Sequence, residues 1–270
     1  MGPIADIFGY LLNWLYELVQ SYGWAIILFS IITKVILLPI SIKQQQSMEK
    51  SSKMQPKIKE MQEKYKENKE KLNEEMFRMY KEEKMNPFSG CVSMVIQLVL
   101  LVAMFFLVRS PLTHMLKMDS VEVEQYVNEV KENSENGEKI TYPEIAVVKE
   151  KGFLNMEFLG LNLGEVPSQN MKNWKVYIIP ILYLIFSFGT SRLTLNMQNG
   201  KKKEDKTEEN EMDKAMQMNN SMMMFMPLLS VYIAFIAPLG LGLYWLMNSL
   251  LQVIQQWIMM QISKRKGENV

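Results

Sequence analysis

The residue most able to do chemistry in this 270-residue chain is Lys34, near the middle of the apolar stretch Trp24–Ile42. A charge within a bilayer costs roughly 2.5 to 3.5 kcal/mol on insertion scales. Lys34 is eight residues from Ile42, about 12 Å along a helix, which is too far for easy contact with bulk water. The apolar stretches contain no Asp or Glu to pair with it. We therefore expect a hydrated pocket that offers positive charge to an acidic ligand; a neutral or lipid-facing lysine without a role is the alternative.

Other polar side chains fall within the apolar stretches. Thr33 is the neighbour of Lys34, and Gln97 lies in the second apolar stretch. Amide side chains recur along the last stretch, at Asn248, Gln252, Gln255 and Gln256. The first three of these share one helical face. Singly, each group could hold two helices together by hydrogen bonding, but together they indicate a polar groove.

The sequence lacks the residues of most catalytic and metal sites. Cys91 is the one cysteine, which excludes an intrachain disulfide and a cysteine-based metal cluster. His114 is the one histidine, so a multi-histidine metal site is excluded and a catalytic triad would have to be built around it. There is no phosphate-binding loop. We therefore expect no metal, no cofactor and no enzymatic activity.

The overall charge is balanced. The chain has 30 basic and 29 acidic residues, for a net charge of +1. This balance weighs against nucleic acid as the main partner, because nucleic-acid-binding domains present a basic surface. Because the sequence also shows no sign of ATP hydrolysis, any work that the protein does must be driven by binding energy or by the membrane.

Apolar and charged residues are separated into long blocks, which is typical of an integral membrane protein. We predict helices in these blocks, because a lone strand in lipid would leave its backbone without hydrogen bonds. Residues 221–263 are nearly free of charge over 43 residues, about 64 Å of helix. A bilayer core is about 30 Å thick, so this block must turn back at the Pro and Gly residues near 237–242. The five predicted spans are residues 24–42, 87–108, 174–190, 221–237 and 238–263.

The charges of the connecting segments predict how the chain crosses the membrane. Residues 43–86 carry 12 Lys and Arg, whereas residues 109–173 carry 7, against 11 Asp and Glu. Because basic connections lie on the cytoplasmic side, the N-terminus is predicted outside and the tail, residues 264–270, inside. Residues 109–173 are then an extracellular loop, and residues 191–220 a cytoplasmic one.

Two segments outside the spans show helical periodicity. Residues 1–23 are predicted to form an amphipathic helix on the outer membrane surface; a short extra span is the alternative. Residues 43–86 are predicted to form a cytoplasmic helical hairpin with a thin apolar seam; a solvated charged loop is the alternative. The candidates for partner contact on this hairpin are Lys53, Lys57, Lys59 and Lys64.

Several motifs occur in the order found in one known family. They are KVILLPI at Lys34–Ile40, MQPKIKE at Met54–Glu60, MNPFSGC at Met85–Cys91 with Gln97 after it, FLNMEFL at Phe153–Leu159 and PLGLGLYWLMNS at Pro238–Ser249. In these motifs, which are spread over nearly the whole chain, the sequence resembles the YidC/Oxa/Alb membrane-protein insertases. The resemblance is strongest to the YidC proteins of Gram-positive bacteria.

The resemblance implies an all-α integral membrane protein, with five transmembrane helices around a hydrophilic groove. Gln97 and Trp245 match groove-lining positions of the family. Lys34 stands where the family usually has arginine, so the charge is kept but the planar two-point contact of arginine is lost. Ser93 stands where the family has a proline. The expected groove residues are Lys34, Thr33, Gln97, Trp245, Asn248 and Gln252.

The resemblance and the residues together predict a multi-pass insertase of the bacterial cell membrane. It would move nascent hydrophobic segments from the cytoplasm into the bilayer through the charged groove, without nucleotide hydrolysis. Its expected partners are nascent membrane proteins, the ribosome and membrane lipids, with no nucleic acid beyond the ribosome. The alternative is an assembly chaperone beside the Sec translocon, which is then a further partner. An ion-coupled transporter fits less well, because no internal repeat is visible.

Overall fold

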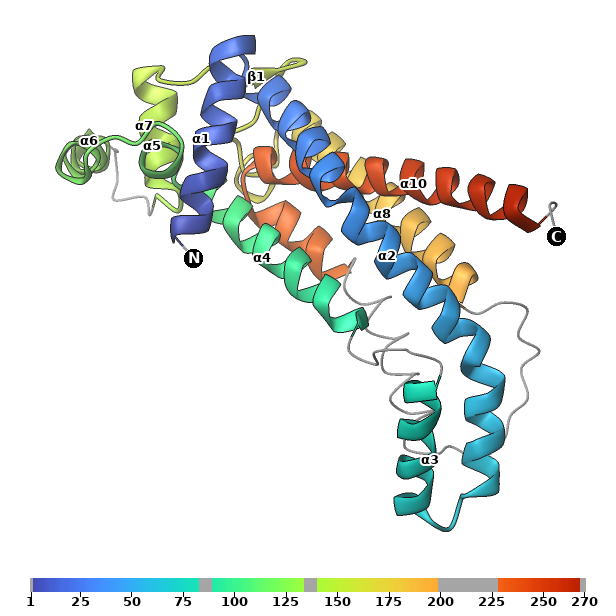
Figure 1. The fold of residues 1–270 in the computed structure, drawn as a ribbon. Helices are drawn as coiled ribbons and strands as arrows, with labels where there is room; N and C mark the ends of the chain where they lie inside the picture. The colour runs from blue at the N-terminus through green and yellow to red at the C-terminus, as the bar shows by residue number, and fades with distance from the viewer. Residues whose placement is uncertain (1, 83–88, 134–139, 199–227, 268–270) are drawn as a thin grey trace. The chain divides into compact units, whose positions relative to one another are not determined.

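The computed structural model describes residues 2–82, 89–133, 140–198 and 228–267 (Figure 1). Most of these residues are helical, as the sequence predicts. The chain divides into two compact units. The first unit contains residues 1–35, 98–190 and 226–270, and the second contains residues 36–97 and 191–225.

Two described stretches are long and apolar enough to cross a membrane. They are Tyr22–Gln44, with a mean hydropathy of 2.4, and Trp174–Leu193, with 1.5. A shorter apolar stretch is Leu98–Arg109. The predicted span at 221–237 begins outside the described residues, so only its later part is seen. These three stretches lie mainly in α2 (Tyr22–Lys64), α8 (Ile178–Gln198) and α4 (Ser89–Arg109), and the predicted span at 238–263 falls in α10 (Leu239–Gly267).

Helix α2 continues well beyond the predicted end of the first span at Ile42. It runs without interruption for 43 residues and contains Pro39 and Pro56. Each proline removes one backbone hydrogen bond, which usually kinks or ends a helix. The residues after Ile42 are mostly Lys, Gln, Glu and Met, which favour helix, and α2 continues through Pro56 to Lys64. One helix therefore contains both the first apolar span and the first arm of the charged segment.

The helical structure is interrupted between residues 228–236, which are helical, and α10. Ala237 and Pro238 lie outside both helices. The first turn of a helix has backbone N–H groups without partners in the helix. Here Leu239 N donates to Glu165 O at 2.9 Å, and Gly240 N donates to Leu163 O at 2.8 Å. The start of α10 is therefore fixed by the loop that follows the small sheet described next.

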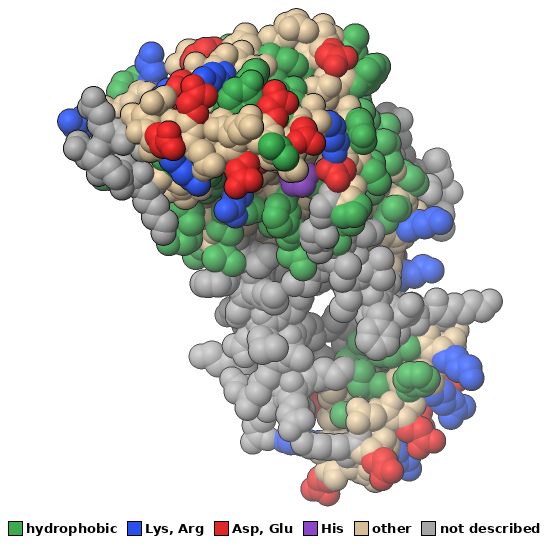
Figure 2. Space-filling model, turned by 90° about the vertical axis from the view of Figure 1, so that its left-hand side faces the viewer, with side chains coloured by type: hydrophobic (Ala, Val, Ile, Leu, Met, Phe, Trp, Pro, Cys, Tyr) green, Lys and Arg blue, Asp and Glu red, His purple; other side chains and the backbone are tan. Residues whose placement is uncertain are grey.

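Residues 109–173, predicted only as a long loop, contain several regular elements. We call these elements, together with α1, the cap. The cap comprises α1 (Gly2–Val19), α5 (Pro111–His114), α6 (Ser120–Asn133), α7 (Pro143–Lys151) and the antiparallel strands β1 (Glu157–Phe158) and β2 (Leu161–Asn162). Helix α1 packs on α5, and α6 packs on α7. Figure 2 shows acidic and basic side chains mixed over the face of the cap.

The core of the first unit joins the cap to the apolar helices. Leu12 of α1, Phe29 of α2, Leu107 of α4 and Tyr244 of α10 are fully or almost fully buried in it. The ring of Phe29 lies 5.6 Å from that of Phe8 and 6.2 Å from that of Tyr244. Aromatic contacts of this kind add specific geometry to the burial of apolar area. Lys34 therefore belongs to a helix that is held firmly one turn before it.

The second unit contains an antiparallel pair formed by the end of α2 and α3 (Lys69–Glu82). Its seam consists of Met54 and Ile58 from α2 and Met76 and Met79 from α3, all buried. The side chain of Asn68 accepts a hydrogen bond from Lys71 N at 3.0 Å and so caps the start of α3. We call this element the α2–α3 pair.

Candidate functional site

Lys34 is held against the last helix by a direct polar contact. Its Nζ donates a hydrogen bond to Oε1 of Gln252, from α10, 218 positions later in the chain. Both side chains are partly buried. The acceptor is a neutral amide, so the contact satisfies one donor of the ammonium group without cancelling its charge. Gln252 therefore gives Lys34 a hydrogen-bond partner but no counter-charge.

The hydroxyl groups near Lys34 on α2 are used within their own helix. Thr33 is buried, and its Oγ1 donates to the carbonyl oxygens of Phe29 at 2.8 Å and Ser30 at 3.1 Å. Ser30 is also buried and donates to Ile26 O at 2.8 Å. Sequence reasoning did not select Ser30, although it lies four residues before Lys34 and therefore on the same helical face. These hydroxyls make the helix less apolar beside Lys34 without offering a free donor.

The polar residues of α10 differ in their surroundings. Asn248 Nδ2 donates to Tyr244 O at 2.9 Å, so that group is used one turn back in its own helix. Trp245 is 5% exposed, and its ring lies 5.7 Å from that of Tyr183 on α8. It packs as a core residue between the two helices. Gln255 and Gln256, which follow Gln252, are also buried.

The remaining predicted residues lie in the second unit. Gln97 belongs to α4, and its side chain is outside the described part of the structure. Lys53, Lys57 and Lys64 are exposed on α2, whereas the side chain of Lys59 is outside the description. A shallow groove of the α2–α3 pair has a lining of mixed charge: Lys57, Glu60, Met61, Lys64, Glu75, Arg78, Met79 and Glu82. The groove therefore has both basic and acidic residues in its lining and is not purely positive.

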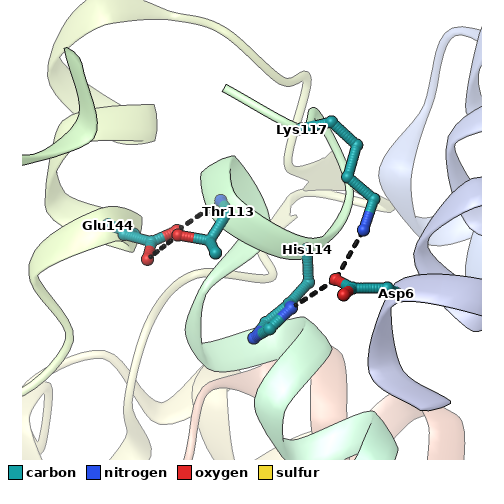
Figure 3. Close-up of polar contacts among 5 residues, drawn as sticks. All are labelled: Asp6, Thr113, His114, Lys117 and Glu144. Atoms are coloured by element: carbon teal, nitrogen blue, oxygen red, sulfur yellow. Dashed lines mark hydrogen bonds and ion pairs between the residues drawn. The ribbon is translucent and has the colours of Figure 1, made fainter. Parts of the chain in front are cut away.

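A second polar cluster, which sequence reasoning did not identify, lies in the cap (Figure 3). Asp6 of α1 contacts both His114 Nδ1, at 2.9 Å, and Lys117 Nζ. Lys117 Nζ also stands 4.8 Å from the ring centre of Tyr10. The hydrogen bond with His114, and then that with Lys117, holds the pKa of the Asp6 carboxyl below its ordinary value. The signals for it in the sequence are weak: Asp6 is one of two acidic residues in a mostly apolar helix, and His114 is the single histidine.

A neighbouring contact strengthens the same part of the cap. Glu144 of α7 accepts hydrogen bonds from Thr113 N at 3.0 Å and from Thr113 Oγ1 at 2.8 Å. Together with the Asp6 contacts it joins α1, α5 and α7. The charges of this cluster are satisfied inside the protein, which indicates a structural role. Among the described residues, no group of three or more His, Cys, Asp or Glu side chains is placed to hold a metal ion.

Comparison with known proteins assigns the chain to a family. The matching family model is described as "60Kd inner membrane protein" and covers residues 14–266. The membrane protein insertase YidC of Caldanaerobacter subterraneus subsp. tengcongensis is 29% identical over 270 residues, which are 100% of both chains. The membrane protein insertase YidC of Fusobacterium nucleatum subsp. nucleatum is 28% identical over 258 residues, 96% of this chain and 95% of that protein.

The fold is also shared with a solved structure. It is the crystal structure of an active YidC insertase with its first transmembrane domain resolved, which matches with a TM-score of 0.52 and 22% sequence identity. The match covers 95% of this chain and 45% of that one. Since the family match extends over nearly the whole sequence, the protein belongs to the YidC/Oxa/Alb family, whose model describes an inner membrane protein.

Proposed function

We propose that the protein is a membrane protein insertase that moves nascent hydrophobic segments from the cytoplasm into the bilayer. The relatives reported above carry this activity in their names. The observation that carries the proposal for this chain is the contact between Lys34 and Gln252. A lysine within an apolar span costs free energy, and a neutral amide partner leaves its charge available to a substrate. Such a residue is expected where an acidic group must be drawn partway into a membrane.

The proposed mechanism begins at the cytoplasmic side. The α2–α3 pair and the C-terminal tail make first contact with the nascent chain or the ribosome, with Lys53, Lys57, Lys59 and Lys64 as contact residues. The mixed charge of the groove on this pair favours weak and varied contacts over one tight basic site. Weak contact suits a protein that must release every substrate it receives.

The substrate then enters a hydrated groove that contains Lys34. Its acidic outer segment is attracted to the ammonium group, an attraction that is stronger in a partly buried site than in bulk water. The membrane potential favours outward movement of a negative charge by about 2.3 kcal/mol per 100 mV. The apolar segment moves sideways into lipid, driven by the hydrophobic effect. These terms supply the work without nucleotide hydrolysis.

The groove itself is part of the proposal. It would be lined by Lys34, Thr33, Gln97, Trp245, Asn248 and Gln252, and its opening requires Trp245 to leave its contact with Tyr183. In the proposed topology five helices cross the bacterial membrane, the cap lies outside the cell and the C-terminus lies inside. Membrane lipids and, for some substrates, the Sec translocon are the further partners.

The test is insertion of a small single-span protein with an acidic outer tail, in cells depleted of their own insertase. Wild type is compared with Lys34→Arg, Lys34→Ala and Lys34→Glu by the protease accessibility of the tail. We expect Lys34→Arg to insert the substrate, and we expect Lys34→Ala and Lys34→Glu to lower insertion, by about tenfold or more for Lys34→Glu, since each 1.4 kcal/mol changes a rate or equilibrium by tenfold.

The matched control is Lys172→Glu, which makes the same change of charge at an exposed position. It should insert the substrate as wild type does. If all Lys34 variants insert equally, charge attraction is not the mechanism. The exposed apolar surface of the spans would then support an assembly chaperone that acts beside the Sec translocon.

A further inference from the structure

The turn between β1 and β2 places a leucine in an unfavourable backbone conformation. The two strands pair through Phe158 and Leu161, so the turn consists of Leu159 and Gly160 alone. Both have positive φ, 51° at Leu159 and 75° at Gly160. Two-residue turns of this type favour Asn-Gly or Asp-Gly, because a left-handed backbone is costly for a residue with a bulky side chain. Glycine is the expected choice at position 160, but leucine is not expected at position 159.

The side chain of Leu159 is also largely exposed to solvent. It is 82% exposed, whereas Phe158 and Leu161 on either side of the turn are 7% and 8% exposed. Leu159 is therefore unfavourable both in its backbone and in the apolar surface that it presents. In the part of the chain that the structure describes, little covers the Leu159 side chain, so a partner that takes it out of water would account for a leucine at this position.

The hairpin lies directly against the first residues of α2. Tyr22 N donates to Asn155 O at 3.0 Å, and the ring of Phe158 meets that of Trp24 edge to face at 5.5 Å. A side chain at Gly23 would overlap the Phe158 ring, so the close approach requires glycine. Trp24 is 51% exposed and lies in the first turn of the apolar stretch Tyr22–Gln44. Tryptophan at the end of a span is typical of the membrane–water interface.

We infer that the β1–β2 turn is a lipid-binding element, which inserts Leu159 into the bilayer surface at the Trp24 end of α2. The partner is the lipid itself, because the turn continues an apolar surface that Trp24 and α2 already present to the bilayer. Burial among acyl chains removes the leucine side chain from water. The hairpin then fixes the depth of the first span and, through it, the depth of Lys34. This inference requires α2 to span a membrane but does not rest on insertase activity.

The experiment measures thiol accessibility in the full chain. Cys91→Ser removes the single native cysteine, and one cysteine is then introduced by Leu159→Cys, Val121→Cys or Ile185→Cys. Each variant is reconstituted into vesicles of phosphatidylcholine and phosphatidylglycerol. The rate of modification by a charged, membrane-impermeant maleimide is divided by the rate for the same chain unfolded in SDS.

The two reference positions are matched to Leu159 by their exposure. Val121 on α6 is 61% exposed and lies in the same connection between spans as Leu159, so both face the same side of the vesicle. Ile185 on α8 is 59% exposed and lies within the apolar stretch Trp174–Leu193. Because the protein covers none of the three positions well, a difference in rate reports the lipid.

The expected result is that Leu159→Cys reacts about tenfold more slowly than Val121→Cys and close to the rate of Ile185→Cys, since an apolar environment disfavours the reactive thiolate. A rate closer to that of Val121→Cys would show that the turn is in water and would overturn the inference. The vesicles contain only this protein and lipid, so protection cannot come from another protein.

Discussion

Two lysines, one in the cap and one in the first span, show opposite uses of the same side chain. Lys117 contacts the Asp6 carboxylate, which also contacts His114, and stands over the Tyr10 ring. Lys34 contacts a neutral amide, Gln252. The charge of Lys117 is therefore compensated by a carboxylate, whereas the contact of Lys34 seen in the described part of the chain is with an uncharged group. The two lysines therefore differ in the chemistry of their partners, a carboxylate for Lys117 and a neutral amide for Lys34.

The difference follows from the surroundings of each lysine. An aspartate at the surface of the cap retains much of its hydration, so an ion pair there costs little and gains little. A carboxylate inside the span would itself have to be desolvated, and it would neutralise the lysine. A glutamine satisfies a hydrogen bond without either effect. This contrast between the two lysines can be tested by variants that disturb the cap and by a variant that gives Lys34 an acidic partner.

The largest effect on stability is expected for Gly9→Ala, which disturbs the packing of α1 on α5 beside the contacts of Asp6 with His114 and Lys117. Gly9 of α1 lies so close to α5 that a Cβ would overlap the carbonyl oxygen of His114. Forcing the two helices apart should lower the free energy of unfolding by about 3 kcal/mol, despite the better helix propensity of alanine. Thermal unfolding in detergent measures this change. Gly189→Ala on α8, where nothing lies within 4 Å of the new Cβ, is the control and should leave stability unchanged or slightly higher.

A smaller effect is expected when Lys34 receives an acidic partner, so that it resembles Lys117. Gln252→Glu should lower insertion of an acidic-tailed substrate by about tenfold, because the new carboxylate competes for the same ammonium group. The protease-accessibility assay measures it. Gln252→Met, which removes the amide and adds no charge, should retain insertion. Equal activity of both variants would mean that the substrate does not depend on the free charge of Lys34.

The smallest effect is expected for Asp6→Asn, which removes the compensating charge of the cap. Because the carboxylate is 41% exposed, its loss should cost at most about 1 kcal/mol of unfolding free energy. The folded-state pKa of Asp6 lies below its ordinary value of 3.8, so the carboxylate stabilises the fold above that pH. This contribution disappears as the pH falls through the lowered pKa.

Melting curves from neutral pH to pH 3 therefore check the sign as well as the size. The loss of unfolding free energy in Asp6→Asn relative to wild type should be largest near neutral pH. It should shrink only in the acidic range, below the ordinary carboxyl pKa. Insertion should remain as in wild type. A difference that grows as the pH falls would contradict the assigned role of the Asp6 contacts.

The family and the mostly helical fold could be predicted from the sequence because blocks of apolar residues and local motifs carry them. Lys34 and Gln252 could each be selected as candidate site residues for the same reason, because each is a polar residue in an apolar stretch. Their direct contact was not predictable, since it joins residues 218 positions apart. The end of the first span was set at Ile42 by charge, but helix propensity carries α2 on to Lys64.

Apart from α1, which lies within the predicted helix at residues 1–23, the cap could not be predicted in the same way. Its elements are short, and long-range contacts position them, such as the hydrogen bond of 2.9 Å from the Tyr142 hydroxyl to Ile236 O. Thr113 and Glu144 likewise look unremarkable in the sequence and meet only in the folded chain. Periodicity detects an apolar face that repeats, and in the cap few faces are long enough to repeat.

The seam of the α2–α3 pair has a consequence for its behaviour under oxidative stress. Three of its four buried residues are methionines, Met54, Met76 and Met79. Oxidation converts the thioether of methionine into a polar sulfoxide, and reductases restore it. The core of the first unit is built largely from aliphatic and aromatic side chains, which lack this chemistry. An oxidant would therefore loosen the α2–α3 pair first and reversibly, while the helices around Lys34 kept their packing.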